Sequence, residues 1–124
     1  MPGSDPVEDV LCTARNEATS LVEELREELM AIAESTRANP DDEHDVEGST
    51  VAFERARVTG LLRMAELALH QIDDALDRCR AKTYGRCEGC GARIAAERLA
   101  ALPAATRCRA CATAPGTHPG LQRR

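Results

Sequence analysis

Four of the six cysteines are arranged in two pairs of the form CxxC. The pairs are Cys87-Glu88-Gly89-Cys90 and Cys108-Arg109-Ala110-Cys111, and seventeen residues separate them. Two residues between a pair of thiolates allow one tight turn to direct both sulfurs at a single point, and the separation of the pairs is typical of zinc-binding segments. We therefore expect Cys87, Cys90, Cys108 and Cys111 to bind one structural zinc ion. Four protein ligands leave no open position for water, so hydrolytic chemistry is not expected.

Neighbouring glycines and the two remaining cysteines also enter the interpretation of the CxxC pairs. Gly89 and Gly91 are expected at the left-handed or crowded positions of the first turn. On spacing alone, two disulfides, unrelated thiols or an iron–sulfur cluster remain open as alternatives to zinc. Cys12 and Cys79 lie outside the pairs. They could form a redox pair, but a free cysteine at a helical seam usually acts as a small buried apolar side chain, and we favour that interpretation.

The elements that must position these cysteines are predicted to be long helices. The 124 residues include no Trp, one Tyr and one Phe, and Ala, Leu, Glu and Arg dominate the composition. Apolar residues at three- and four-residue spacing predict one helix that ends before Asn39-Pro40, and a heptad seam predicts a second. The predicted seams are Val7, Leu11, Ala14, Ala18, Leu21, Leu25, Leu29 and Ile32, and then Val51, Val58, Leu62, Ala65, Leu69, Ile72, Leu76 and Cys79.

Two helices of about 32 to 36 residues with a short connection should fold back on each other. The expected fold is mainly α: a long antiparallel coiled-coil helical hairpin with a small C-terminal four-cysteine zinc finger. The predicted parts are the hairpin, residues 5–82, with its tip at 39–48, the finger, residues 84–112, and a flexible tail, residues 113–124. Since two helices bury little area, we expect a closing contact near the finger. It would join Leu11 and residues 72–79 to Tyr84, Ile94, Leu99 and Leu102.

Charge is divided unevenly along the chain. The net charge is -5, yet residues 84–124 hold seven Arg and two Glu, about +5, which leaves about -10 on residues 1–83. The predicted tip concentrates carboxylates, and they are Asp41, Asp42, Glu43, Asp45 and Glu47. Such a turn would be attracted to a basic partner surface. Most acidic turns, however, are solvated and cap the helix that follows.

The stretch from Tyr84 to Cys111 resembles the DksA/TraR zinc-finger family. The likeness rests on Tyr84-Gly85, both CxxC pairs, Ile94, Arg98-Leu99 and Pro103, together with the predicted hairpin upstream. Members of this family bind bacterial RNA polymerase rather than promoter DNA, and they insert the coiled-coil tip into its secondary channel towards the catalytic magnesium. The resemblance therefore implies a transcription regulator whose partner is RNA polymerase and whose tip carboxylates take part in binding.

Two departures from the family's pattern bear on function. The family's tip motif is DxxDxA, and residues 42–47 match both aspartates, Asp42 and Asp45, but have Glu47 in place of Ala. The family's basic residues that help to hold guanosine tetraphosphate on the second helix have no counterpart between Met64 and Asp74, which offers only His70. The resemblance therefore does not extend to guanosine tetraphosphate. His44, in the tip, is expected to be an exposed turn residue without a role.

Two other functions remain open. A DNA-binding zinc ribbon would use the arginines around the finger, which are Arg86, Arg93, Arg98, Arg107 and Arg109, although the net acidity and the lack of a recognition helix argue against direct sequence-specific DNA binding. A thiol-based zinc redox sensor would release its metal on oxidation.

Other classes of protein are excluded by what the sequence lacks. It has no set of Ser, His and Asp and no phosphate-binding glycine loop, so we do not expect an enzyme. It has no apolar run long enough to span a membrane, and its first residues do not resemble a signal peptide, so we expect a cytoplasmic protein with no membrane partner.

Overall fold

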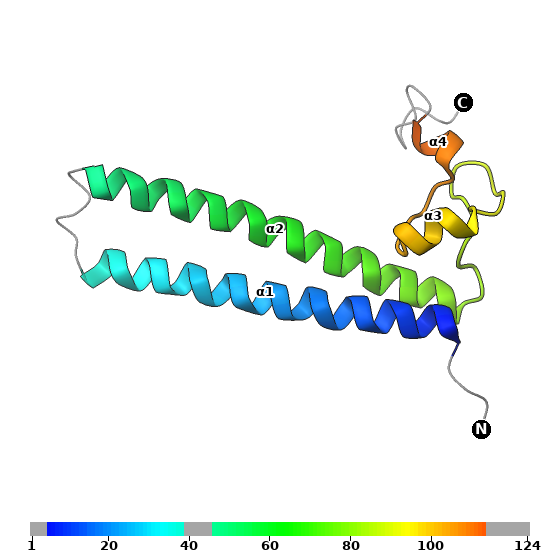
Figure 1. The fold of residues 1–124 in the computed structure, drawn as a ribbon, viewed down its shortest axis with the longest axis horizontal. Coiled ribbons are helices and arrows are strands. Elements are labelled where there is room, and N and C mark those ends of the chain that lie inside the picture. The colour runs from blue at the N-terminus through cyan, green and yellow to red at the C-terminus, as the bar shows by residue number, and fades with distance from the viewer. Residues whose placement is uncertain (1–4, 39–45, 114–124) are drawn as a thin grey trace. The chain divides into compact units, whose positions relative to one another are not determined.

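Four helices are present in the computed structural model, which describes residues 5–38 and 46–113. They are α1 (Pro6–Ala38), α2 (Val46–Arg80), α3 (Ala96–Ala101) and α4 (Arg109–Thr113) (Figure 1). Over these described residues, β-type pairing is limited to one isolated antiparallel bridge between Arg86 and Arg93. The expected mainly α fold, with a hairpin of two long helices and a four-cysteine segment after it, is confirmed. None of the described helices has a stretch both long and apolar enough to cross a membrane.

The first long helix begins at residues suited to a helix N-terminus. One carboxylate oxygen of Asp5 accepts a hydrogen bond of 3.0 Å from the backbone N–H of Val7. Pro6 occupies the first helical position, where its missing N–H leaves no bond unmade and its fixed φ already suits the helix. Asp5 therefore caps α1, and the chain enters the helix with a defined geometry.

The second long helix ends in a left-handed residue. Lys82 has a φ of 67°, and the backbone N–H groups of Lys82 and Thr83 donate to the carbonyl oxygens of Cys79 and Arg78, at 3.2 and 2.9 Å. This is the Schellman arrangement, in which glycine is the usual left-handed residue because it has no Cβ. The chain thus leaves α2 through a tight reversal, directly before the segment that carries the cysteines.

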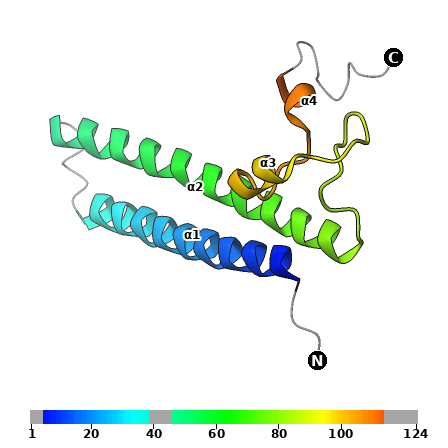
Figure 2. The same cartoon turned by 45° about the vertical axis from the view of Figure 1, so that its right-hand side comes forward.

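Contacts divide the chain into two compact units, residues 14–70 and residues 1–13 with 71–124. The first unit consists of parts of α1 and α2, which lie side by side (Figure 2). Its core is formed by apolar residues from both helices. The buried ones are Val22, Leu25, Val58 and Ala65, and the partly buried ones that pack against them are Leu29, Ile32, Leu62 and Leu69.

The seam of α1 was predicted correctly except in its middle. Val22 is 3% exposed whereas Leu21 is 47% exposed, so the prediction of Leu21 as a seam residue is wrong. Positions 21 and 22 lie three and four residues after Ala18, and both spacings keep a side chain on the same helix face. The larger leucine favoured position 21 in the sequence, but the packing against α2 selects position 22.

Polar contacts beside the seam of this first unit show that the two helices run in opposite directions. Arg26 of α1 pairs with Glu66 of α2 at 3.0 Å. Further along α1, the hydroxyl oxygen of Thr36 accepts a hydrogen bond of 3.2 Å from Arg55, which lies earlier in α2. The arginine that interrupts the predicted heptad seam is therefore used to bond the neighbouring helix.

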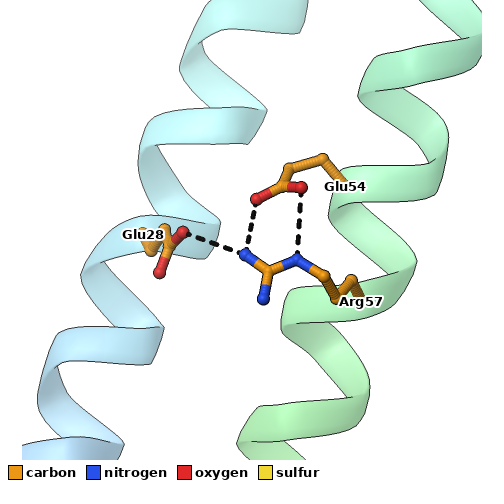
Figure 3. A network of polar contacts seen from close by, with 3 residues as sticks. All are labelled: Glu28, Glu54 and Arg57. Atoms are coloured by element: carbon orange, nitrogen blue, oxygen red, sulfur yellow. Dashed lines mark hydrogen bonds and ion pairs between the residues drawn. The ribbon is translucent and has the colours of Figure 1, made fainter.

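A third polar contact of the first unit joins three charged side chains (Figure 3). The guanidinium of Arg57 donates two hydrogen bonds to the carboxylate of Glu54, at 2.7 and 3.2 Å, and lies 3.6 Å from a carboxylate oxygen of Glu28 on α1. Hydrogen bonding from Arg57 lowers the pKa of Glu54. Because these side chains are about half exposed, the contact helps to define the register of the helices rather than adding much stability.

The second unit contains its own apolar core, formed by the start of α1, the end of α2 and the segment that follows. Leu11, Ala75 and Leu76 are buried in it. The partly buried residues that pack against them are Val7, Ile72, Cys79, Tyr84 and Ala104. The predicted closing contact is therefore confirmed for Tyr84.

Three other residues of the predicted closing contact do not belong to this core. Ile94 is buried but lies outside it, and Leu99 is only partly buried. Leu102 is 51% exposed, so its predicted place in the contact is wrong. Ala104 packs there instead, since the chain bends at residues 102–104 after the short helix α3 and brings the smaller side chain to the core.

Candidate metal centre

The first CxxC pair sits in a tight turn held by backbone hydrogen bonds. The N–H of Cys87 donates to the carbonyl oxygen of Ala92 at 2.8 Å, and the N–H of Gly91 donates back to the carbonyl oxygen of Cys87 at 2.9 Å. Gly91 has a φ of 79°, a left-handed conformation that glycine adopts without strain. The N–H of Gly89 also donates to the sulfur of Cys87, at 3.2 Å. These hydrogen bonds therefore hold the sulfur of Cys87 in place.

The second CxxC pair lies at the start of α4. The backbone N–H of Cys111 approaches the sulfur of Cys108 at 3.5 Å, and the N–H of Ala112 donates to the carbonyl oxygen of Cys108 at 2.9 Å. The turn into α4 thus places both sulfurs of this pair on one side of the chain.

Two hydrogen bonds hold the second pair against the first pair and α3. The N–H of Glu88 donates to the carbonyl oxygen of Thr106 at 2.8 Å. The Nε of Arg98, which belongs to α3, donates to the carbonyl oxygen of Arg107 at 2.9 Å. Both acceptors directly precede Cys108, so these bonds determine where the second pair lies.

Four sulfurs converge as a result. The Sγ atoms of Cys87, Cys90, Cys108 and Cys111 all lie within 4.8 Å of one another. Those of Cys90 and Cys108 are 3.9 Å apart, close to the separation of about 3.8 Å expected along an edge of a zinc tetrahedron with Zn–S bonds of about 2.3 Å. A disulfide would require about 2.05 Å, and all six cysteines are free thiols. The disulfide alternative is therefore excluded in this structure, and the donor set fits zinc.

The pKa values within the cluster reflect this crowding. Burial raises the pKa of Cys87, but hydrogen bonds from the backbone of Cys108, Cys90 and Gly89 outweigh burial and lower it to about 6. Hydrogen bonding with Cys87 and Cys108 raises the pKa of Cys111 to about 12. The sulfurs thus compete for negative charge, which a divalent cation in place of the shared protons would relieve.

The glycine at the centre of the first pair is required by space. A Cβ added to Gly89 would lie 3.0 Å from both Cys111 Sγ and Arg107 Nη1. The prediction that Gly89 and Gly91 occupy left-handed or crowded positions is confirmed, since Gly89 is crowded and Gly91 is left-handed.

The arginines around the finger are largely engaged within it. Arg86 donates to the carbonyl oxygen of Gly91 at 3.3 Å, Arg98 bonds the carbonyl oxygen of Arg107, and Nη1 of Arg107 is buried. Arg93 and Arg109 are exposed. The DNA-binding alternative loses much of its basis, because two of the five arginines assigned to it are hydrogen-bonded within the finger and a third has a buried guanidinium nitrogen.

Cys12 and Cys79 differ in their surroundings. Cys79 is half-buried and packs against the core of the second unit, in agreement with its prediction as a small apolar side chain. Cys12 is exposed, so the same interpretation is wrong for it. The reason is its position next to Leu11, the fully buried seam residue, because consecutive residues of a helix point in different directions.

The acidic tip falls mostly outside the described residues. Asp41, Asp42, Glu43, His44 and Asp45 all belong to the segment left undescribed, and Glu47 lies in the first turn of α2 without a described side chain. The tip residues therefore remain a prediction from sequence.

The sequence did not predict the two hydrogen bonds that hold the second CxxC pair in place. The carbonyl oxygens of Thr106 and Arg107 are backbone groups, and nothing in residue type or spacing marks them as acceptors. The buried end of the Arg107 side chain was likewise grouped with exposed basic residues. The run of arginines around the cysteines was the available signal, but it does not distinguish those that point inwards.

Comparison with known proteins finds two similarities. Residues 82–114 match the family of the prokaryotic dksA/traR C4-type zinc finger. The structure is similar to that of the transcription factor DksA2 from Pseudomonas aeruginosa, with a TM-score of 0.70 and 28% sequence identity over 82% of this chain and 74% of that chain. No curated protein sequence matches the chain. Residues 82–114 therefore match the dksA/traR C4-type zinc finger, and the fold of the chain is similar to that of DksA2.

Proposed function

We propose that this protein is a transcription factor of the DksA/TraR type that binds bacterial RNA polymerase. The observation that carries the proposal is the presence, in one chain, of a C4-type finger of this family and a helical hairpin similar to that of DksA2 at a TM-score of 0.70. A protein that acts in this way is a binding regulator rather than an enzyme, and it works in the cytoplasm, where the polymerase is.

Within this proposal the four cysteines hold one structural zinc ion. Cys87, Cys90, Cys108 and Cys111 are its ligands, because their sulfurs converge within 4.8 Å and a closed set of four thiolates suits zinc. When bound, the ion joins the two CxxC turns and stabilises a segment that has little apolar core of its own. The backbone bonds from Glu88 to Thr106 and from Arg98 to Arg107 set the same arrangement from the protein side.

The acidic turn between the two long helices is the part proposed to enter the secondary channel of the polymerase. Its residues Asp41, Asp42, Glu43, Asp45 and Glu47 place carboxylates where a basic, magnesium-containing channel would attract them. Asp42 and Asp45 are the two that match the family's tip motif, so we propose that their carboxylates exert the effect on transcription once the protein is bound.

Transcription in vitro with purified bacterial RNA polymerase tests this function. The zinc-loaded protein is compared with the double variant Asp42→Asn and Asp45→Asn, and polymerase binding is measured beside the yield of transcripts from several promoters. We expect the double variant to bind the polymerase but to lose its effect on transcription, because Asn keeps the size of each side chain and removes its charge.

The matched control is the double variant Glu23→Gln and Glu27→Gln, which removes two charges from exposed positions of α1. It should regulate as the wild type does. If the tip variant also regulates as the wild type does, the role of Asp42 and Asp45 is refuted. If the wild-type protein does not bind the polymerase at all, the proposed function as a whole is refuted.

A further inference from the structure

Arg107 directly precedes the second pair of cysteines, and its main chain is held in place. Its carbonyl oxygen accepts the 2.9 Å hydrogen bond from Nε of Arg98, and the carbonyl oxygen of the preceding Thr106 accepts the 2.8 Å bond from the backbone of Glu88. The backbone of Arg107 therefore has one defined position, which limits where the side chain can go.

The end of this side chain is buried beside the sulfurs. Within the described part of the chain, Nη1 of Arg107 is one of three buried side-chain nitrogen or oxygen atoms without a hydrogen-bond partner. A Cβ on Gly89 would lie 3.0 Å from this Nη1 and 3.0 Å from Sγ of Cys111, so the two atoms are within about 6 Å of each other. The space that a side chain at position 89 would fill is thus bordered by a guanidinium and a zinc-ligand sulfur.

The charges on the two sides of this space are opposite. Four thiolates around one Zn²⁺ carry a net charge of about -2. A guanidinium stays protonated at any pH at which proteins fold, and a buried charge is costly unless it is paired. Nη1 of Arg107 has no hydrogen-bond partner among the described residues, the cysteine sulfurs included, so the nearby zinc–thiolate cluster would offset its charge at longer range.

We propose that Arg107 is the counter-charge of the zinc–thiolate cluster, directed at Cys111. In this role it is a positioning residue: it stabilises the negative charge on the zinc-bound sulfurs and makes them weaker nucleophiles. Gly89 leaves room for it, and Arg98 aligns it. The inference rests on the proposed assignment of the four cysteines as zinc ligands.

The experiment compares full-length zinc-loaded proteins. Zinc affinity is measured by competition with a chromophoric chelator, and zinc release is followed after addition of N-ethylmaleimide. Arg107→Gln should weaken zinc binding by about tenfold or more, the usual effect of losing a partner of a metal ligand. It should also speed release several-fold, because the sulfurs become more reactive. In the cobalt(II)-substituted protein, the thiolate-to-cobalt charge-transfer band should move to lower energy.

Arg93→Gln is the matched control, since Arg93 is an exposed arginine of the same finger. It removes the same charge away from the sulfurs and should leave affinity, release and spectrum unchanged. Arg107→Lys retains the charge and should recover most of the affinity. If Arg107→Gln prevents the finger from folding, Arg107→Lys still tests the proposal. A lysine variant that binds zinc ten times more weakly than the wild type would overturn the role of the charge.

The outcomes separate this inference from the zinc assignment. A wild-type protein that binds no zinc refutes the assignment of the four ligands. A wild-type protein that binds one zinc, with Arg107→Gln and Arg93→Gln alike in affinity, release rate and cobalt spectrum, refutes only the role of Arg107.

Discussion

The hydroxyl group of Tyr84 donates a hydrogen bond of 2.6 Å to the carbonyl oxygen of Pro103. Tyr84 stands just before the first CxxC pair, and its ring packs against the core of the second unit together with Leu11 and Leu76. Burial raises the pKa of the phenol, with a smaller contribution from Cys79, so the hydroxyl remains a donor at neutral and mildly alkaline pH. The Tyr84 side chain thus connects the core of the second unit to the segment between the two cysteine pairs.

Replacement of Tyr84 by Phe should lower stability by about 1 kcal/mol, because the ring stays packed while the carbonyl oxygen of Pro103 loses its donor. Urea unfolding of the zinc-loaded protein, followed by circular dichroism, measures this loss. Thr83→Val is the control, since the hydroxyl of Thr83 is exposed and its bond to Arg78 is long, at 3.4 Å. Equal losses in the two variants would mean that the Tyr84 bond adds no more than a surface contact.

Leu11→Ala should be the more damaging of two neighbouring substitutions. Leu11 is 0% exposed at the centre of the second unit's core, so its truncation leaves a cavity and should cost about 3 kcal/mol. Val10 is 53% exposed, and Val10→Ala should cost less than about 0.5 kcal/mol. The same urea titration compares them. Similar costs would contradict the assignment of position 11 to the seam.

Lys82→Gly should stabilise the protein by about 1 kcal/mol. Lys82 holds a φ of 67° at the end of α2, which strains a residue with a Cβ and is free of strain for glycine. Lys82→Ala serves as the control, because it removes the charge and keeps the Cβ, and it should give no gain. The midpoint of thermal unfolding reports both changes, and a loss of stability with glycine would show that the left-handed turn is not strained.

The spacing of residues was sufficient to predict most of the fold and the convergence of the four cysteines. Two CxxC pairs require no long-range information, because each pair acts within one turn. The end of α1 was also marked locally, by Asn39-Pro40 directly beyond Ala38. Periodicity failed at Leu21, where two neighbouring positions satisfied the same pattern and only the facing helix could decide between them.

The support of the metal centre could not be predicted in the same way. Arg98 and Arg107 look like the other arginines of the finger in the sequence, and their roles arise only when α3 and the second cysteine pair are brought together. Leu102 was likewise expected in the core because it is apolar, but the bend after α3 leaves it exposed and places Ala104 there. The roles of the two arginines and the exchange of Leu102 for Ala104 depend on packing between segments distant in the sequence, and residue type and local spacing do not predict that packing.

The two cysteines outside the cluster should differ in reactivity. Cys79 is half-buried, and its sulfur lies 3.9 Å from a carboxylate oxygen of Asp5. Burial raises the pKa of the Cys79 thiol, and the carboxylates of Asp5 and Glu8 raise it further. Because the thiolate is the reacting form, its labelling curve should be displaced to higher pH than that of an ordinary thiol. Maleimide added to the zinc-loaded protein should therefore modify the exposed Cys12 first.

Asp5→Asn tests the electrostatic part of this prediction. Asparagine caps a helix as well as aspartate does, so α1 should keep its N-terminus while the charge near Cys79 is removed. The pKa of Cys79 should then fall and its labelling, followed by mass spectrometry of the modified peptides between about pH 7 and 9, should become faster. Asp9→Asn, at an exposed position one turn on, should leave the rate unchanged. If Cys79 reacts as fast as Cys12 in the wild type, its burial in the core of the second unit is contradicted. If Asp5→Asn has no effect on the rate, burial alone determines its reactivity.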